Sequence, residues 1–267
     1  MPESEVILWT SADAYERYMG RWSRQIAPLF LEWLAIPAGM DWIDIGSGTG
    51  VLSAVIAERC APRRLAGVDP SEAFLSTARS RVINPSAEFR QGSADHLPYT
   101  DREFNAAVSG LVLNFVADND KALAEMARVV APGGTVALYV WDYAGHMQIM
   151  RQFFDAAIEL DEGARKFDDG VMAPVCRPGP LARLFEAARL DDIEVRALDI
   201  PAAFASFDDY WAPFLGGTGS GPKYCASLSC DARARLRERL SVRVPTGPDG
   251  EILLAVRAWA VKGKVGQ

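Results

Sequence analysis

The sequence predicts an α/β fold built on a doubly wound, mainly parallel sheet. Two observations support this prediction. Between residues 40 and 141, short runs rich in Val, Ile and Leu alternate with segments of helical periodicity. A glycine-rich turn directly follows the first of these runs. Strands that alternate with helices pair in parallel through right-handed crossovers, and ligands bind at the carboxyl ends of the strands.

The expected elements follow one another regularly along the chain. Residues 12–35 carry apolar side chains at helical spacing, and Pro37-Ala38-Gly39 ends that helix. Strands are then expected at 42–45, 64–68, 87–90, 104–108 and 135–141, with helices at 51–60, 71–81 and 118–130. Further helices are expected at 147–160 and 181–188, further strands at 193–198 and 252–261, and a glycine-rich loop at 216–221.

These elements divide the chain into three parts. Residues 1–38 are expected to form an N-terminal helical lid, and residues 39–141 a ligand-binding core. Residues 142–267 are expected to complete the core sheet. Within this last part, about 142–177 and 200–250 are interpreted as insertions that cap the carboxyl edge of the sheet and hold the substrate.

Composition excludes several classes of function. The formal charge is −7 and the basic residues are dispersed, which argues against a nucleic-acid partner. No apolar run is long enough to span a bilayer, and the first ten residues lack a secretory signal, so we expect a cytoplasmic protein without a membrane partner. Four cysteines without a CxxC pair and only two histidines predict no metal site. The protein is expected to be a monomer or a homodimer.

The first expected strand leads into a turn with glycine at alternate positions, Asp44-Ile45-Gly46-Ser47-Gly48-Thr49-Gly50. Glycine lets the backbone turn sharply and approach a ligand without an intervening Cβ. Free N–H groups at the start of the following helix favour an anionic group. A nicotinamide-binding turn has the spacing GxGxxG, whereas this turn has GxGxG, which argues against a dehydrogenase.

Three further motifs follow this turn. Gly67-Val68-Asp69-Pro70-Ser71 lies at the end of the second expected strand. Gly92-Ser93-Ala94-Asp95 precedes Leu97-Pro98-Tyr99, and Arg128-Val129-Val130-Ala131-Pro132-Gly133-Gly134 precedes the fifth strand. In this order and at this spacing, the four motifs resemble the class I S-adenosylmethionine-dependent methyltransferase family, especially the broad group that includes the quinone and sterol enzymes. The resemblance covers residues 40–141 well and the remainder loosely.

The resemblance implies a seven-stranded Rossmann-like methyltransferase fold with helical insertions, S-adenosylmethionine as cofactor and S-adenosylhomocysteine as product. It implies that Asp69 accepts the ribose hydroxyls, that Asp95 and the Ala94 N–H meet the adenine, and that Asp44 offsets the ammonium charge. Further cofactor contacts are expected from Gly46, Ser47, Gly48, Gly50, Pro70, Ser71 and Leu111, and from Tyr15, Tyr18 and Arg21 of the N-terminal segment. Arg21 is the candidate for the methionine carboxylate, with a surface arginine as the alternative.

The acceptor is expected beyond the fifth strand. An aromatic pocket for a small, apolar or aromatic molecule would be lined by Trp141, Tyr143, Phe154, Trp211, Phe214 and Tyr224. The alternative is that these aromatic residues form the core of the insertions themselves. His146 is the candidate general base for an oxygen acceptor, or else an exposed loop histidine.

The predicted reaction is methyl transfer to that small molecule by in-line displacement. No Asn/Asp-Pro-Pro-Tyr/Phe motif follows the fourth strand, where the chain has Ser109-Gly110-Leu111-Val112, which argues against an amino-nucleobase enzyme. Two other functions stay open at this point. One is a protein that binds the cofactor without transferase activity, and the other is a nucleotide-dependent oxidoreductase.

Overall fold

The computed structural model describes residues 20–217 and 219–267. Tyr15 and Tyr18 lie outside the described residues. The chain divides into two compact units. We call Ser23–Val140, Arg177–Leu198 and Trp259–Gln267 the core unit. The insertion unit consists of Trp141–Cys176, Asp199–Ala258 and the residues up to Trp22. The insertion unit covers the first expected insertion up to Cys176 and runs past the second to Ala258.

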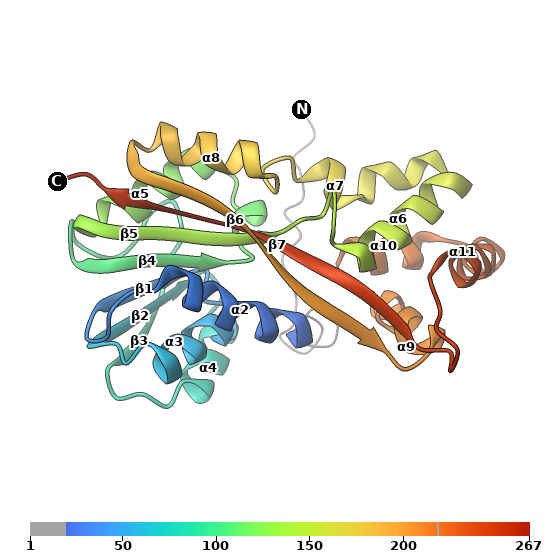
Figure 1. The fold of residues 1–267 in the computed structure, drawn as a ribbon, viewed down its shortest axis with the longest axis horizontal. Coiled ribbons are helices and arrows are strands. Elements are labelled where there is room, and N and C mark those ends of the chain that lie inside the picture. Colours follow the sequence, from blue (N-terminus) through green and yellow to red (C-terminus); the bar gives the residue numbers. More distant parts are fainter. Residues whose placement is uncertain (1–19, 218) are drawn as a thin grey trace. The chain divides into compact units, whose positions relative to one another are not determined.

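A seven-stranded sheet has the order β3-β2-β1-β4-β5-β7-β6. Its strands are β1 (Asp41–Ile45), β2 (Arg64–Asp69), β3 (Ala87–Gln91), β4 (Phe104–Gly110), β5 (Val130–Trp141), β6 (Leu190–Phe204) and β7 (Ile252–Val265). Strands β3, β2, β1, β4 and β5 pair in parallel, and β7 runs opposite to β5 and β6 (Figure 1). The predicted doubly wound, mainly parallel fold is therefore confirmed.

Helices cover both faces of the sheet in the core unit. They are α2 (Arg21–Leu34, in this unit from Ser23 on), α3 (Val51–Arg59), α4 (Glu72–Arg81), η2 (Leu113–Phe115), α5 (Asn119–Arg128) and α8 (Pro178–Ala187). Figure 1 shows α3 and α4 on one face and α5 and α8 on the other. Side-chain caps fix two of the helix starts, because Ser71 accepts the Phe74 N–H and Asp118 accepts the Lys121 N–H. These caps explain why α4 and α5 begin within a residue of the predicted positions.

Helix α2 packs as a layer of the core unit from Ser23 on, whereas the sequence placed residues 1–38 in a separate lid. The rings of Phe30 and Tyr139 lie 4.7 Å apart between centroids. Trp33 donates its indole N–H to Glu194 of β6 at 2.9 Å. Lys262 of β7 forms an ion pair with Glu194 and stacks over the Trp33 ring. The apolar side of α2 is therefore buried against the strands of the core unit.

Strands β5, β6 and β7 are longer than the sequence predicted. β6 covers Leu190–Phe204 instead of 193–198, and its later residues alternate between buried and exposed positions. Pro201 lies inside it, although proline cannot donate a ladder hydrogen bond. β6 is the last strand in the sheet order, and an edge position tolerates proline. An apolar run alone therefore underestimates the length of such a strand.

The insertion unit is largely helical. Its elements are α6 (Gln148–Leu160), η3 (Glu162–Phe167), α7 (Asp169–Met172), α9 (Phe207–Trp211), η4 (Ala212–Leu215), α10 (Ser220–Ser227) and α11 (Cys230–Arg243). The expected glycine-rich loop 216–221 is shorter, because α10 begins at Ser220 after Gly219, whose φ is +98°. Among residues 20–217 and 219–267, no helix combines the length and apolar character needed to cross a membrane.

Arginines of α11 tie the insertion unit together. Arg239 and Arg243 form ion pairs with Glu159 of α6, and Arg237 pairs with Asp208 of α9. Arg243 also reaches Asp155 of α6. These three arginines of α11 therefore pair with acids of their own unit.

Candidate functional site

The glycine turn joins β1 to α3 in the core unit. The N–H groups of Gly46 and Ser47 both donate to the Val68 carbonyl of β2, at 2.8 and 2.9 Å. Gly46, Gly48 and Gly50 all have positive φ, at 70°, 53° and 80°. This left-handed backbone costs other L-residues free energy, which explains glycine at alternate positions.

The three glycines have different surroundings. A Cβ at Gly46 would lie 2.5 Å from the Val112 side chain, and one at Gly50 would lie 3.0 Å from Ala78. A Cβ at Gly48 would meet only the Gly46 carbonyl oxygen, at 3.9 Å. Gly46 and Gly50 are therefore required by packing within the protein, whereas the space over Gly48 is open to a ligand.

Asp69 ends β2 beside this turn and is buried. Its Oδ2 accepts the Gly48 N–H at 2.9 Å, and its Oδ1 accepts the Ser71 N–H at 2.8 Å. Burial raises the pKa of Asp69, while these two N–H donors lower it. Each oxygen retains a lone pair, so the carboxylate can accept hydroxyl donors of a sugar.

Asp44 lies on β1 and is completely buried. Its Oδ2 accepts the Ser53 hydroxyl of α3 at 2.6 Å. Burial and, to a smaller extent, the charge of Asp69 raise the pKa of Asp44 to about 7, although the hydrogen bonds of Ser53 lower it. Two acids in one buried region disfavour a second negative charge and favour a cationic ligand group.

A buried hydroxyl adds to this region. The Ser47 Oγ has no hydrogen-bond partner among the described residues, although the side chain is buried. This oxygen has almost no accessible surface and lies 3.1 Å from the position of a Cβ at Gly67, so it faces β2 and not an open space. The open space over Gly48 and the Asp69 carboxylate suit a ligand with a sugar, and the buried Asp44 favours a cationic group on it.

The loop after β3 carries Ala94 and Asp95, both of intermediate exposure. Asp95 accepts a hydrogen bond from Ser93 and forms an ion pair with Lys121 of α5 at 3.5 Å. The Ser93 bond and, to a lesser extent, the Lys121 charge lower the pKa of Asp95. His96 beside it is exposed.

Leu111 follows β4 with a φ of +63°, which is rare for a residue other than glycine. Its N–H donates to the Tyr139 carbonyl at 2.8 Å, which holds this conformation. Val112 next to it contacts the region over Gly46. Pro70, another predicted contact, lies between Asp69 and Ser71 and accepts the Gln91 amide through its carbonyl. The core unit thus brings together the predicted residues from the ends of β1, β2 and β4.

Arg21 belongs to the insertion unit. Its guanidinium lies 4.5 Å from the ring centroids of both Trp22 and Phe204. The guanidinium is thus stacked on aromatic rings, which a surface arginine of an isolated helix would not be. Its predicted contact with a carboxylate stays a prediction.

The predicted acceptor-side aromatic residues are all buried in the insertion unit: Trp141, Tyr143, Phe154, Trp211, Phe214 and Tyr224. Phe153 stacks on Phe214 with centroids 4.2 Å apart and meets Phe154 edge-on at 5.1 Å. Tyr224 donates to Asp161 at 3.2 Å. These contacts match the alternative interpretation as a core of the insertions, and the pocket-lining role stays a prediction.

His146 lies in the turn between β5 and α6, and 56% of its side chain is exposed. Its backbone N–H donates to Asp142 Oδ2 at 2.8 Å, and its Nδ1 lies 3.9 Å from the same oxygen. The structure therefore places a buried carboxylate beside the candidate base, which the sequence analysis did not identify.

Two further residues of the site were missed. Ser53 is a buried polar residue on the apolar side of α3, and this position was a usable signal in the sequence. Arg81 at the end of α4 donates to the carbonyl and hydroxyl of Thr49 at 2.9 and 2.7 Å, inside the glycine turn. No local pattern marks Arg81, because the contact joins residues 32 positions apart.

Comparison with known proteins matches a family model described as "Methyltransferase domain" to residues 43–138. The chain is 36% identical over 110 residues to 2-phytyl-1,4-naphtoquinone methyltransferase of Thermosynechococcus vestitus, over 40% of this chain and 49% of that protein. It is 32% identical over 114 residues to demethylmenaquinone methyltransferase of Lactobacillus johnsonii, over 41% of this chain and 47% of that protein. The aligned region thus spans about half the length of these curated relatives.

Solved structures share the fold over most of the chain. The YcgJ protein of Bacillus subtilis has a TM-score of 0.59 at 20% identity, covering 91% of this chain and 99% of that one. Phosphoethanolamine N-methyltransferase 2 of Haemonchus contortus, solved with S-adenosyl-L-methionine, has a TM-score of 0.59 at 16% identity, covering 96% and 56%. Residues 43–138, with their glycine turn and acidic strand end, therefore match a methyltransferase domain.

Proposed function

We propose that this protein transfers a methyl group from S-adenosylmethionine to a small, apolar or aromatic molecule by in-line displacement. Two similar proteins are named as quinone methyltransferases, which supports a flat acceptor of this class. S-adenosylhomocysteine is the expected product.

One observation carries the proposal: the Asp69 carboxylate is hydrogen-bonded to the N–H of Gly48, at the one glycine of the turn where a side chain would meet open space. This arrangement presents bare backbone and an acid at the same place. Backbone without a Cβ lets a ligand approach closely, and a carboxylate is the acceptor that ribose hydroxyls need.

The residues of the core unit have separable tasks. Asp69 would hold the ribose, Asp44 would offset the ammonium group, and the loop with Ala94 and Asp95 would meet the adenine. When bound, S-adenosylmethionine supplies a sulfonium methyl group whose positive charge is lost during transfer. Holding two reactants in line can contribute about 7–11 kcal/mol to catalysis, so orientation is the main effect that we assign to the protein. His146 would accept a proton only from an acceptor that carries a weakly acidic one.

The test is binding of S-adenosylmethionine and of S-adenosylhomocysteine to the purified chain by calorimetry, followed by mass spectrometry with labelled cofactor and a panel of quinones and phenols. We expect Asp69→Ala to weaken binding at least tenfold, about the effect of losing one charge-assisted hydrogen bond. Glu186→Ala, which removes an exposed acid of α8 in the same unit, is the matched control.

Each outcome separates the candidate functions. Labelled product supports the transferase, whereas tight cofactor binding without product from the panel or a metabolite extract supports a binding protein. Binding of a nicotinamide dinucleotide without binding of S-adenosylmethionine would support the oxidoreductase. Equal affinity of the Asp69→Ala and Glu186→Ala variants would contradict the assignment of the ribose site.

A further inference from the structure

One face of α5 is directed at the loop that carries Asp95. Lys121, Glu125 and Arg128 follow one another at intervals of four and three residues, which places them on the same side of a helix. Lys121 pairs with Asp95 at 3.5 Å, and the Glu125 Oε2 accepts the Leu97 N–H at 2.8 Å. Three successive side chains of this face therefore contact three successive parts of the loop.

Arg128 makes most of these contacts. Its Nη1 donates to the Tyr99 carbonyl at 2.9 Å and to Asp101 at 2.8 Å, and its Nη2 lies 3.3 Å from the Leu97 carbonyl. Its Nε and Nη2 also bind both oxygens of Glu125, at 2.6 and 2.8 Å. The planar guanidinium and the carboxylate thus form a rigid pair that binds the N–H and the carbonyl of the same residue, Leu97.

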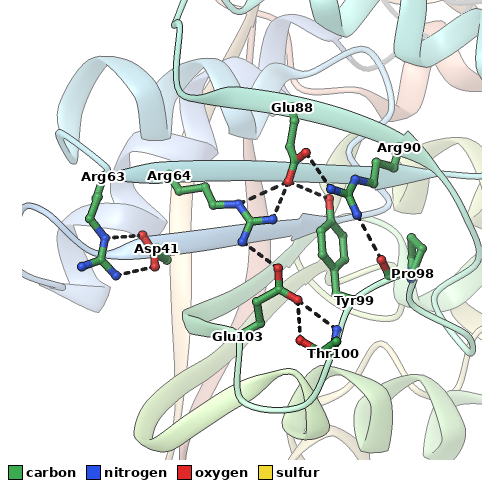
Figure 2. A network of polar contacts seen from close by, with 9 residues as sticks. All are labelled: Asp41, Arg63, Arg64, Glu88, Arg90, Pro98, Tyr99, Thr100 and Glu103. Atoms are coloured by element: carbon green, nitrogen blue, oxygen red, sulfur yellow. Dashed lines mark hydrogen bonds and ion pairs between the residues drawn. The ribbon is translucent and has the colours of Figure 1, made fainter.

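A second network holds the same loop from the strands (Figure 2). Arg90 of β3 donates to the Pro98 carbonyl at 3.3 Å and pairs with Glu88 at 2.9 Å. Arg64 of β2 bridges Glu88 and Glu103, and Glu103 accepts the backbone N–H and the hydroxyl of Thr100. The Tyr99 ring lies between the two arginines, 4.6 Å from Arg90 and 5.5 Å from Arg64. The loop from residue 97 to residue 100 is therefore fixed on both sides.

This fixed segment begins two residues after Asp95. The Asp95 side chain itself is more than a third exposed, and its contacts are a neighbouring serine and a long lysine. An exposed carboxylate recognises a ligand well only when its backbone is already in place, because ordering the loop on binding costs conformational entropy. The contacts of Glu125 and Arg128 supply that order without touching the ligand.

We propose that Glu125 and Arg128 are positioning residues for cofactor recognition, which hold the Ala94–Asp95 segment in the geometry that meets the adenine. The inference rests on the proposed function, since it concerns the adenine end of S-adenosylmethionine. It assigns a role in cofactor affinity to a helix that contributes no predicted ligand contact. Arg128 belongs to the fourth sequence motif, and in this role it acts through the third motif, Gly92-Ser93-Ala94-Asp95.

The test compares Arg128→Gln and Glu125→Gln with Arg243→Gln. Arg243 is the matched control because its side chain is also 30% exposed and pairs with two acids, but in the insertion unit. We expect the first two variants to raise the Kd of S-adenosylmethionine and S-adenosylhomocysteine about tenfold, the equivalent of one net hydrogen bond. The kcat at saturating cofactor should stay within about twofold, because the reacting atoms are not moved.

Two further measurements distinguish positioning from general stabilisation. Hydrogen exchange at the Leu97 amide should become faster in Arg128→Gln under conditions where the amides of β1 and β4 keep their protection. In the Asp95→Ala background, Arg128→Gln should change the Kd less than it does in the wild type, because one of the two contacts that it positions is absent. Arg128→Lys should recover only part of the affinity, since lysine cannot form the paired contacts.

Several results would overturn the proposal. Wild-type affinity in both Gln variants would do so, and so would an additive effect of Arg128→Gln and Asp95→Ala. If the wild-type chain does not bind S-adenosylmethionine, the proposed function fails. Hydrogen exchange then still decides the structural part, because unchanged exchange at Leu97 would show that the pair does not hold the loop.

Discussion

Replacing Asp44 by asparagine tests how strongly the core resists a buried charge next to the glycine turn. Asp44 is 1% exposed and accepts the Ser53 hydroxyl at 2.6 Å. Asparagine has nearly the same shape and keeps an oxygen for Ser53. The substitution therefore removes the titration of this carboxyl and leaves most of its packing unchanged.

The magnitude follows from the pKa. Burial, reinforced by the charge of Asp69, raises the pKa of Asp44 from 3.8 to about 7. Because the folded pKa exceeds the unfolded one, the contribution to stability is complete below the unfolded pKa and is lost as the pH rises through the folded one. A pKa change of about three is worth about 4 kcal/mol, of which about 2.5 kcal/mol falls between about pH 5 and about pH 8.

The assay is urea unfolding of both proteins without cofactor, followed by tryptophan fluorescence at the two pH values. The free energy of unfolding of Asp44→Asn minus that of the wild type should increase by about 2.5 kcal/mol from about pH 5 to about pH 8. Glu186→Gln, an exposed acid, should show no such gain. A difference between Asp44→Asn and wild type that stays constant over this range would refute the reasoning about burial.

Three further predictions concern the turn, the insertion unit and the candidate base. Gly48→Ala should lower the unfolding free energy by about 1–2 kcal/mol because of its left-handed backbone, and it should weaken cofactor binding. Gly46→Ala should be less stable than Gly48→Ala, because its Cβ would lie 2.5 Å from the Val112 side chain. Urea midpoints and calorimetry check this pair, and equal stability of the two variants would contradict the prediction. Phe153→Ala should lower the unfolding free energy by about 3–5 kcal/mol, because this buried ring stacks on Phe214, and a loss below 1 kcal/mol in urea unfolding would argue against a packed aromatic core. His146→Ala should retain kcat within about tenfold from pH 6 to pH 9, and a loss of about a hundredfold would instead identify a general base.

The sequence alone determined the parallel sheet, the order of its elements and the place of the glycine turn. Each of these depends on neighbours along the chain. Apolar periodicity separates helix from strand, and Ser71 and Asp118 cap α4 and α5 through N–H groups three residues away. Glycine at positions 46, 48 and 50 predicted a sharp turn, and all three have a positive φ in the structure.

The sequence could also point to Asp69 as the acid at a strand end, but not to what holds it. Its hydrogen bond to the Gly48 N–H joins residues 21 positions apart, and the Arg81 contacts with Thr49 join residues 32 apart. Neither contact has a local pattern, because the partners meet only when β1, β2 and α4 have packed together. The hydrogen bonds from Glu125 and Arg128 to the loop after Asp95 likewise join residues that are distant along the chain.

Burial decided the remaining questions. An aromatic side chain in an insertion can line a pocket or pack with its neighbours, and its residue type is the same in both cases. Only the packed structure shows Phe153 stacked on Phe214, and only the packed structure removes enough water around Asp44 to raise its pKa to about 7. Local patterns fix backbone conformation because they act between neighbours, whereas desolvation and side-chain contacts depend on atoms that the fold brings from distant parts of the chain.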